Sequence, residues 1–352
     1  MSTAARTTDA SRLTDAYPAA YKDFYGLPSL PPCVYKSGRP YHEGTGALYL
    51  RVGLRVGNAD KRTVLLTAAH IATEEIIALG DKGYRDAVTN MQSSVRDLSE
   101  MISIWNDDIA ELCECTNGGV EDEEIAEKCQ EVEDLVNKVR TTPEQRTIGF
   151  VLHVEPIAVS DGPHQFIRDW VLIELYEDKI VWDSFNSNQV YVGKYLSPYD
   201  YREIMFPRPE DHAGYMYLHN GLLQANGVVK DKEMHSPQYL DANGCKCLRV
   251  VKNSLATGTT VGHVNGLDSF TCVYTKDSNG SEQTAIEVAV LPYDRKRGAF
   301  SAPGDSGAIV GMLTGGGGKA EDTDITYLTP YWWLEEEIKK VFPGFYLYDT
   351  LQ

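Results

Sequence analysis

The sequence lacks any apolar run of the length that a membrane span needs, about 20 residues. Its first residues, Met1 to Thr8, also lack the apolar core of a signal peptide. From these absences we expect a soluble, intracellular, cytoplasmic protein. Positive charge is scarce too, because 33 Lys and Arg residues face 51 Asp and Glu residues, which gives a net charge of −18. An acidic field of this size repels nucleic acid and anionic membranes, so we expect neither as a partner.

The cysteines lack the spacing of a metal site or a disulfide framework. There are seven of them, an odd number, and they are scattered along the chain. Cys113 and Cys115, like Cys245 and Cys247, have one residue between them, whereas a zinc knuckle usually has two. We therefore expect free thiols, no metal and no cofactor.

A long amphipathic interruption divides two β-rich regions. At about 86–140, apolar residues recur at steps of three and four on both sides of Gly118-Gly119, which predicts an antiparallel helical hairpin. The alternative is that each apolar stripe packs separately on the β body. The simplest role is packing, and an exposed hairpin would offer a surface for a protein partner or for self-association.

The rest of the chain indicates a mainly β protein. Strand-like segments with branched and aromatic residues occur at 47–52, 63–67, 148–159 and 170–175, and again from 248 onward. We expect Thr329 to cap a C-terminal helix with Pro330 in its first turn. The predicted organisation is an N-terminal arm at 1–44, a first β unit at 45–175, an irregular connection at 176–247, and a second β unit with the helix at 248–352.

Three short segments contain residue types that catalyse acyl transfer. His70 follows an apolar strand, Asp169 precedes one, and Ser306 lies in the segment Gly304-Asp305-Ser306-Gly307. Taken singly, the histidine and the aspartate are more often structural, and the serine segment is sometimes only a turn. Taken together, they supply a general base, a carboxylate to orient it, and a nucleophile.

The glycines around Ser306 suit that chemistry. An acyl-transfer serine needs backbone N–H groups aimed at the developing oxyanion. Gly304 can adopt backbone angles that turn its N–H toward a substrate, and the N–H of Ser306 would be the second donor. We therefore predict an oxyanion hole formed by Gly304 and Ser306.

The three segments, in the order His, Asp, Ser, resemble the signature segments of trypsin-like serine proteases. The segment Asp324 to Pro330 makes the chain most similar to the intracellular trypsin-like proteins of fungi. The resemblance implies two six-stranded antiparallel β-barrels of the chymotrypsin kind. It also implies Phe300 at the floor of the specificity pocket, and a strand at Thr314, Gly315 and Gly316 that pairs with the substrate backbone.

The segment after the serine is shorter than this family requires. Thr314 follows Ser306 by only eight positions (314 − 306). We expect either an abnormally tight reversal at Gly311 or a missing hairpin in the second barrel. Three functions follow as alternatives: a serine endopeptidase acting on peptides or proteins, a catalytically impaired protease-like scaffold, and an esterase with the same triad.

Overall fold

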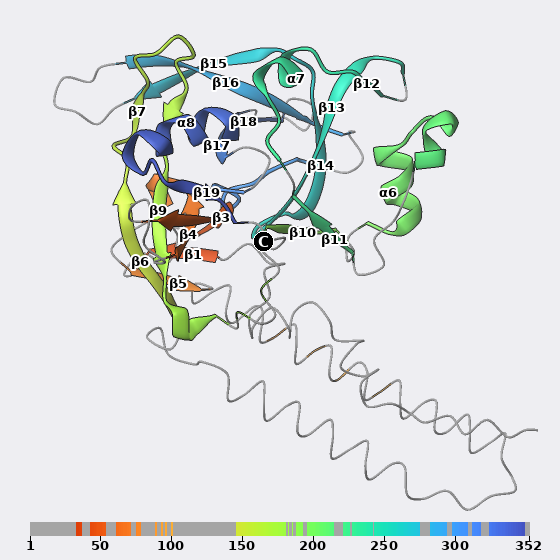
Figure 1. Cartoon of the computed structure of the whole chain (residues 1–352). Helices are drawn as coiled ribbons and strands as arrows, with labels where there is room; N and C mark the ends of the chain where they lie inside the picture. The colour runs from red at the N-terminus through yellow and green to blue at the C-terminus, as the bar shows by residue number, and fades with distance from the viewer. Residues whose placement is uncertain are drawn as a thin grey trace, which may run out of the picture.

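The computed structural model describes residues 33–36, 43–53, 61–71, 75–78 and 146–348, together with isolated positions between 89 and 100. Gaps within the last range lie at 181, 183–184, 186–187, 193–195, 215–220, 226, 242, 275–281, 294–297, 309–311 and 318–323. The helical hairpin expected at about 86–140 therefore lies almost wholly outside the described residues. In the described part, two antiparallel sheets form the body (Figure 1).

The first sheet has eight strands in the order β19-β3-β4-β9-β6-β5-β1-β2. Strands β4 and β9 are central and buried on both faces, because Val64 and Leu66 join one core cluster while Leu65 joins another. The bounds are β1 Cys33–Lys36, β2 Glu43–Thr45, β3 Leu48–Gly53, β4 Lys61–Thr67, β5 Glu75–Ala78, β6 Thr147–Val154, β9 Val171–Leu175 and β19 Phe345–Leu347.

The second sheet has seven strands in the order β12-β13-β14-β16-β18-β17, with β15 also paired to β16. Its β13–β14 hairpin turns at Leu255, Ala256 and Thr257, and Gly258 closes the turn with a φ of 62°. The bounds are β12 Tyr239–Leu240, β13 Lys246–Ser254, β14 Gly258–Val264, β15 Asp268–Tyr274, β16 Glu282–Pro292, β17 Met312–Gly317 and β18 Ile325–Thr329.

Short elements complete the described part. Two small sheets pair β7 (Ala158–Val159) with β8 (Ile167–Arg168), and β10 (Gln189–Tyr191) with β11 (Leu222–Gln224). The helices are α6 Pro198–Met205, α7 Asp231–His235 and α8 Tyr331–Val341, and the 3-10 turns are η1 Ala69–Ile71, η2 Glu177–Lys179 and η4 Pro209–Gly214.

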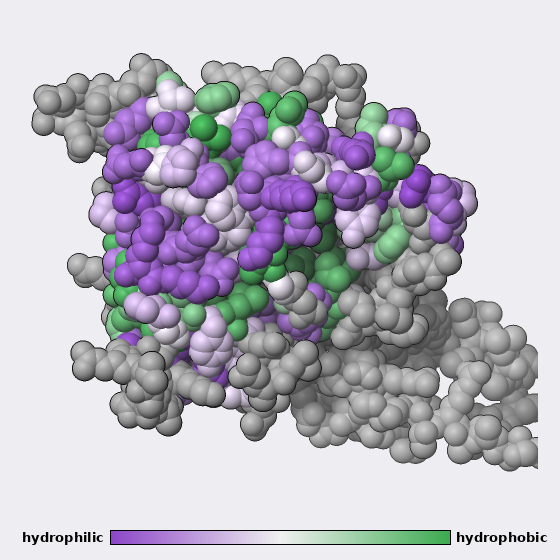
Figure 2. Space-filling view, turned by 45° about the horizontal axis from the view of Figure 1, so that its top comes forward, coloured by the Kyte–Doolittle hydropathy of each residue, from purple (hydrophilic) through white to green (hydrophobic). Residues whose placement is uncertain are grey.

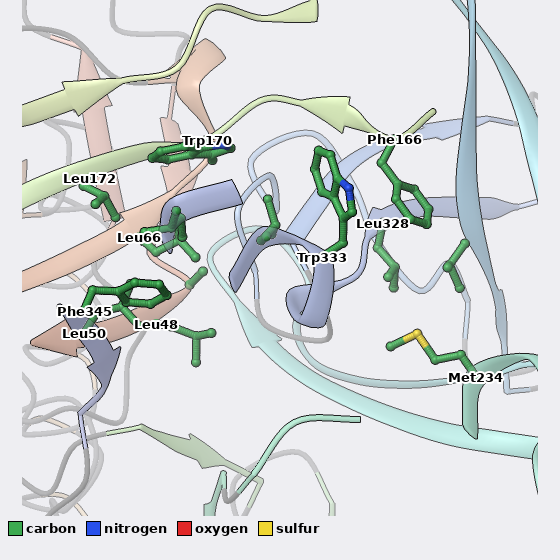
Figure 3. Close-up of a cluster of buried hydrophobic side chains, with 14 of the residues drawn as sticks. Leu48, Leu50, Leu66, Phe166, Trp170, Leu172, Met234, Leu328, Trp333 and Phe345 are labelled. Atoms are coloured by element: carbon green, nitrogen blue, oxygen red, sulfur yellow. The ribbon is translucent and has the colours of Figure 1, made fainter. Parts of the chain in front are cut away.

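One hydrophobic core joins the two sheets through α8. Figure 3 shows Trp333 of α8 between Leu66 and Trp170 on the side of the first sheet and Phe166 and Leu328 on the other side. Leu334 and Ile338 of this helix are also fully buried, whereas Val341, which the apolar spacing also predicts to be buried, is 42% exposed at the last position of the helix. The two sheets therefore pack as one body, and residues at their junction are held from both sides.

The predicted cap of α8 is wrong. Pro330 is the N-cap residue and no side chain caps the helix. The hydroxyl of Thr329 lies instead within hydrogen-bond distance of Ile167 O and the carboxyl of Glu287. The Thr329 hydroxyl is therefore paired with the buried carboxyl group of Glu287 on β16 and does not cap the helix.

The expected pair of closed six-stranded barrels also needs correction. The sheets have eight and seven strands, and among the described residues the end strands β19 and β2 do not pair, nor do β12 and β17. The first sheet gains β19 because the chain after α8 returns to the edge of β3. In the second sheet the amide of Gly307 bonds to Leu313 O of β17 at 2.9 Å. The expected choice between a tight reversal at Gly311 and a missing hairpin falls on residues 309–311, which lie outside the described residues.

Strands also extend beyond the expected unit boundaries. Strands β1 and β2 fall mainly within the range expected as an N-terminal arm, and β19 belongs to the first sheet although it lies within the second unit in sequence.

The surface face in Figure 2 is mostly hydrophilic, with hydrophobic residues in small groups. None of the helices among the described residues has the length and apolarity to cross a membrane.

Candidate active site

His70 and Asp169 meet because β4 and β9 are antiparallel neighbours. Thr67, the last residue of β4, pairs with Val171, the first residue of β9. The residues that follow β4 and those that precede β9 therefore lie at the same end of this strand pair. His70 lies in the short turn η1, with 35% of its side chain exposed, whereas the Asp169 side chain is only 6% exposed.

Two hydrogen bonds fix the imidazole against the carboxylate. His70 Nδ1 lies 2.6 Å from Asp169 Oδ2, and the backbone N–H of His70 donates to Asp169 Oδ1 at 3.0 Å. A carboxylate accepts, so Nδ1 carries the proton in this pair and Nε2 is left as the acceptor. Burial lowers the pKa of His70, but the hydrogen bond and the charge of Asp169 outweigh it, and the net pKa is raised.

Ser306 lies on a tight turn that requires glycine on both sides. Gly304 and Gly307 have φ values of 106° and 88°, a region that side chains disfavour. A Cβ on Gly307 would lie 2.2 Å from Thr45 O, so no larger residue fits there. The amide of Asp305 donates to Ala302 O at 3.0 Å and closes the turn.

Thr45 joins this turn to the first sheet. Its backbone N–H donates to Ser306 O at 2.7 Å, and its hydroxyl donates to Gly304 O at 3.2 Å. Its carbonyl accepts a hydrogen bond from Thr67 Oγ1 at 2.8 Å. Because Thr67 ends the strand that leads to His70, one fully buried residue connects the serine turn with the strand that precedes the histidine.

The site lacks one contact that the resemblance implies. Within the described residues, no hydrogen bond joins Ser306 Oγ to His70 Nε2. In the same part of the chain, the N–H groups of Gly304 and Ser306 have no protein acceptor. Two free donors on the serine turn are what an oxyanion hole needs, and nucleophile–base contacts are often long in a ligand-free enzyme.

Asp305 joins the serine turn to Lys252 and to the β13–β14 turn. The carboxylate and Lys252 Nζ are both fully buried and lie 3.0 Å apart. Asp305 also accepts from the amides of Ala256, Thr257 and Ala302 and from Thr257 Oγ1. All five partners are donors, so the carboxylate needs no proton. Burial raises the pKa of Asp305, but the Lys252 charge and these hydrogen bonds bring it below its usual value.

The residues expected to contact substrate occupy different environments. Phe300 is 1% exposed and belongs to the main core, where its backbone bonds to Asp324 and Thr260. Thr314 is half-buried, and Gly316 is exposed and paired with Thr326. Strand β17, which carries Thr314, Gly315 and Gly316, is the last strand of its sheet, so one of its edges has no neighbouring strand among the described residues.

Three solved structures that are similar to this one are described as proteases. Thermobifida fusca Protease A is 13% identical with a TM-score of 0.38, and the match covers 92% of this chain and 100% of that one. Nocardiopsis protease is 11% identical with a TM-score of 0.39, covering 90% and 97%. A glutamic acid-specific serine protease, described as using a histidine triad in substrate binding, is 11% identical with a TM-score of 0.37, covering 92% and 100%. These values are too low to assign a family. No family model and no curated protein matches the chain.

Sequence reasoning missed the residues that hold the candidate site together. Thr45 had no motif around it, and only the junction of the two sheets shows its contacts. Lys252 gave a usable signal, because a lysine within the strand-like segment Leu248 to Ser254 is unusual for a buried strand. A charged residue at such a position predicts a buried partner, which here is Asp305.

Proposed function

We propose that this protein is a serine endopeptidase with His70, Asp169 and Ser306 as its catalytic triad. The observation that carries the proposal is the 2.6 Å contact from His70 Nδ1 to Asp169 Oδ2. It leaves Nε2 as a base, and Thr45 joins the serine turn to the strand that leads to His70. The N–H groups of Gly304 and Ser306, which have no protein acceptor among the described residues, are a second observation in favour of the proposal.

The proposed reaction has two stages, acylation of Ser306 and hydrolysis of the acyl-enzyme, and the same residues act in both. Ser306 Oγ attacks the carbonyl carbon of the scissile peptide while His70 Nε2 takes the serine proton. The oxyanion accepts hydrogen bonds from the Gly304 and Ser306 N–H groups. His70 then gives its proton to the leaving amine, and water hydrolyses the acyl-enzyme by the same steps in reverse. Asp169 keeps the imidazole in the required tautomer and stabilises the imidazolium.

The free edge of β17 is the proposed site for the substrate backbone. An extended peptide that pairs with Thr314 to Gly316 would add one strand to the second sheet. The register of the β17–β18 pairing shifts between Leu313 and Gly315, so the ladder is irregular at Thr314. Because Phe300 is buried in the core, we propose that it shapes the pocket from behind rather than contacting the substrate directly.

We further propose that the two sheets are the two lobes of a chymotrypsin-like fold. The short spacing from Ser306 to Thr314 in the sequence supports a reduced second lobe. The sequence motifs resemble those of the fungal trypsin-like proteins, and the helical region at about 86–140 would be an insertion into the first lobe.

A serine-directed fluorophosphonate probe tests the proposal. We expect the folded protein to be labelled at Ser306, with labelling lost in Ser306→Ala and retained in Ser236→Ala, an exposed serine distant from the site in sequence. Peptide-library cleavage then separates a peptidase from an esterase, since an esterase would hydrolyse only the ester substrates. Absence of labelling at Ser306, with trypsin labelled in parallel, would support the scaffold alternative and overturn the proposal.

A further inference from the structure

Glu287 is a buried acid that the proposed reaction does not use. It lies in β16 of the second sheet and is 0% exposed. In the part of the chain that the structure describes, no Lys, Arg or His forms an ion pair with it. A buried carboxylate without a cation is unfavourable, so its surroundings must provide another form of stabilisation.

Its partners lie next to the segment that carries Asp169. The Ile167 N–H donates to Glu287 Oε1 at 2.9 Å, two residues before Asp169. The neighbouring residue of β16, Ile286, donates its N–H to Gln165 O at 3.0 Å. Figure 1 shows the β7–β8 segment, in yellow-green, crossing the β15–β16 hairpin. Two successive residues of β16, Ile286 and Glu287, therefore form hydrogen bonds with the segment 165–167.

The backbone of this segment is strained at Gln165 and needs contacts that hold it in place. Gln165 has a φ of 51°, the left-handed region that residues other than glycine disfavour. Phe166 is 2% exposed and inserts into the core near Trp333 (Figure 3). A residue in this conformation persists only when its surroundings hold it there. The contacts with Ile286 and Glu287 are on both sides of Phe166 and supply that restraint.

The third partner reveals which form of the carboxyl fits. Thr329 Oγ1 lies 3.1 Å from Glu287 Oε2 and 3.4 Å from Ile167 O. A hydroxyl has one proton, and both of these neighbours are acceptors if Glu287 is ionised. If Glu287 is protonated, it donates to Thr329, the hydroxyl donates to Ile167 O, and Ile167 N–H donates to Oε1. Every group in this ring is then satisfied.

We propose that Glu287 is a positioning residue that stays protonated in the folded protein and closes a hydrogen-bond ring holding the segment that carries Asp169. The neutral form also keeps a second negative charge away from Asp169, on which the histidine depends. The proposal concerns the same site and rests on the proposed function for its effect on activity. Its effect on stability does not depend on that function.

The charges around Glu287 agree with a neutral carboxyl. The pKa of Glu287 is raised to about 8, because burial and the charges of Asp169 and Asp268 raise it by more than the hydrogen bonds from Ile167 and Thr329 lower it. Arg168, which follows the bonded Ile167, forms ion pairs with Glu155 and Asp161, and His235 bonds to Asp268. The strands paired with β16 also carry His263 on β14, Cys272 and Tyr274 on β15, and Tyr327 on β18, and α8 begins with Tyr331.

The matched variants are Glu287→Gln, Glu287→Ala and Thr329→Val, with the exposed Glu336→Gln on α8 as control. Glutamine mimics the protonated acid, because its carbonyl accepts from Ile167 N–H and its amide donates to Thr329. The other two variants break the ring and leave a buried polar group unsatisfied. We expect Glu287→Gln and the control to keep the wild-type rate of Ser306 labelling at pH 7, and the ring-breaking variants to lose about tenfold.

Stability as a function of pH is the readout that needs no activity. The free glutamate loses its proton near pH 4.5 and the folded one near pH 8, so rising pH favours the unfolded chain between these values. Urea unfolding should show the unfolding constant of the wild type rising relative to Glu287→Gln by up to about tenfold per pH unit in this window.

The outcomes separate the two proposals. If Glu287→Gln weakens labelling as much as Glu287→Ala, or if its stability relative to the wild type does not change with pH, the ionised form is the required one and the ring proposal is wrong. If neither the wild type nor any variant is labelled, but the stability of the wild type relative to Glu287→Gln follows the expected pH dependence, the ring is supported and the proposed peptidase function fails.

Discussion

Replacing Lys252 by Met should destabilise the protein strongly, because it leaves a buried carboxylate unpaired. The ammonium and Asp305 Oδ2 are 3.0 Å apart and fully buried. At an effective dielectric constant of about 20, two charges at this distance attract by about 5 kcal/mol. Removing one partner of a buried pair costs about 3–5 kcal/mol. Asp305 keeps four other donors, so we expect a loss of about 3 kcal/mol in the free energy of unfolding.

The loss should depend on pH in a defined direction. In the wild type the pKa of Asp305 is lowered, so its contribution to stability is present above the unfolded pKa of 3.8 and disappears as pH falls through the lower folded value. In Lys252→Met the unpaired carboxylate takes up a proton more readily. The gap in unfolding free energy between the two proteins should therefore be widest near pH 7 and narrow toward pH 4.

Urea unfolding followed by tryptophan fluorescence measures this gap at each pH. Lys246→Met is the matched control, because Lys246 lies on the same strand and is exposed. The control should change the unfolding free energy by less than about 0.5 kcal/mol. A loss below about 1 kcal/mol for Lys252→Met, or a loss of equal size at pH 4 and pH 7, would refute the assignment of an ionised buried pair.

Three further predictions concern the candidate site. Because the pKa of His70 is raised and the base must be neutral, kcat/KM for peptide hydrolysis should fall on acidification with an apparent pKa above 6.5, and Asp169→Asn should lower kcat by about 10³–10⁴-fold. Gly307→Ala places a Cβ 2.2 Å from Thr45 O at a φ of 88°, so calorimetry should show a loss of about 2–4 kcal/mol; an unchanged Tm would contradict the described turn. Thr45→Val removes the hydroxyl bound to Gly304 O and should slow fluorophosphonate labelling of Ser306 while leaving the far-UV circular dichroism unchanged.

The sequence alone determined the β-rich character of the chain and the local setting of the three candidate residues. The apolar strands before His70 and after Asp169 have short-range patterns that reflect their burial, and the glycines around Ser306 reflect local backbone angles. The spacing after Ser306 likewise left too little chain for a strand pair. These features are set by nearest neighbours, so they can be predicted without knowing how distant segments meet.

The tertiary structure decided which distant groups hold the site in place. Thr329 illustrates the difference, because its position before a helix predicts a cap, yet its hydroxyl lies beside Glu287. Thr45, Lys252 and Glu287 act through contacts with residues more than 40 positions away, and the return of β19 to β3 gives the first sheet its additional edge strand. Local periodicity carries no information on such pairings, which depend on how two sheets and one helix pack around a shared core.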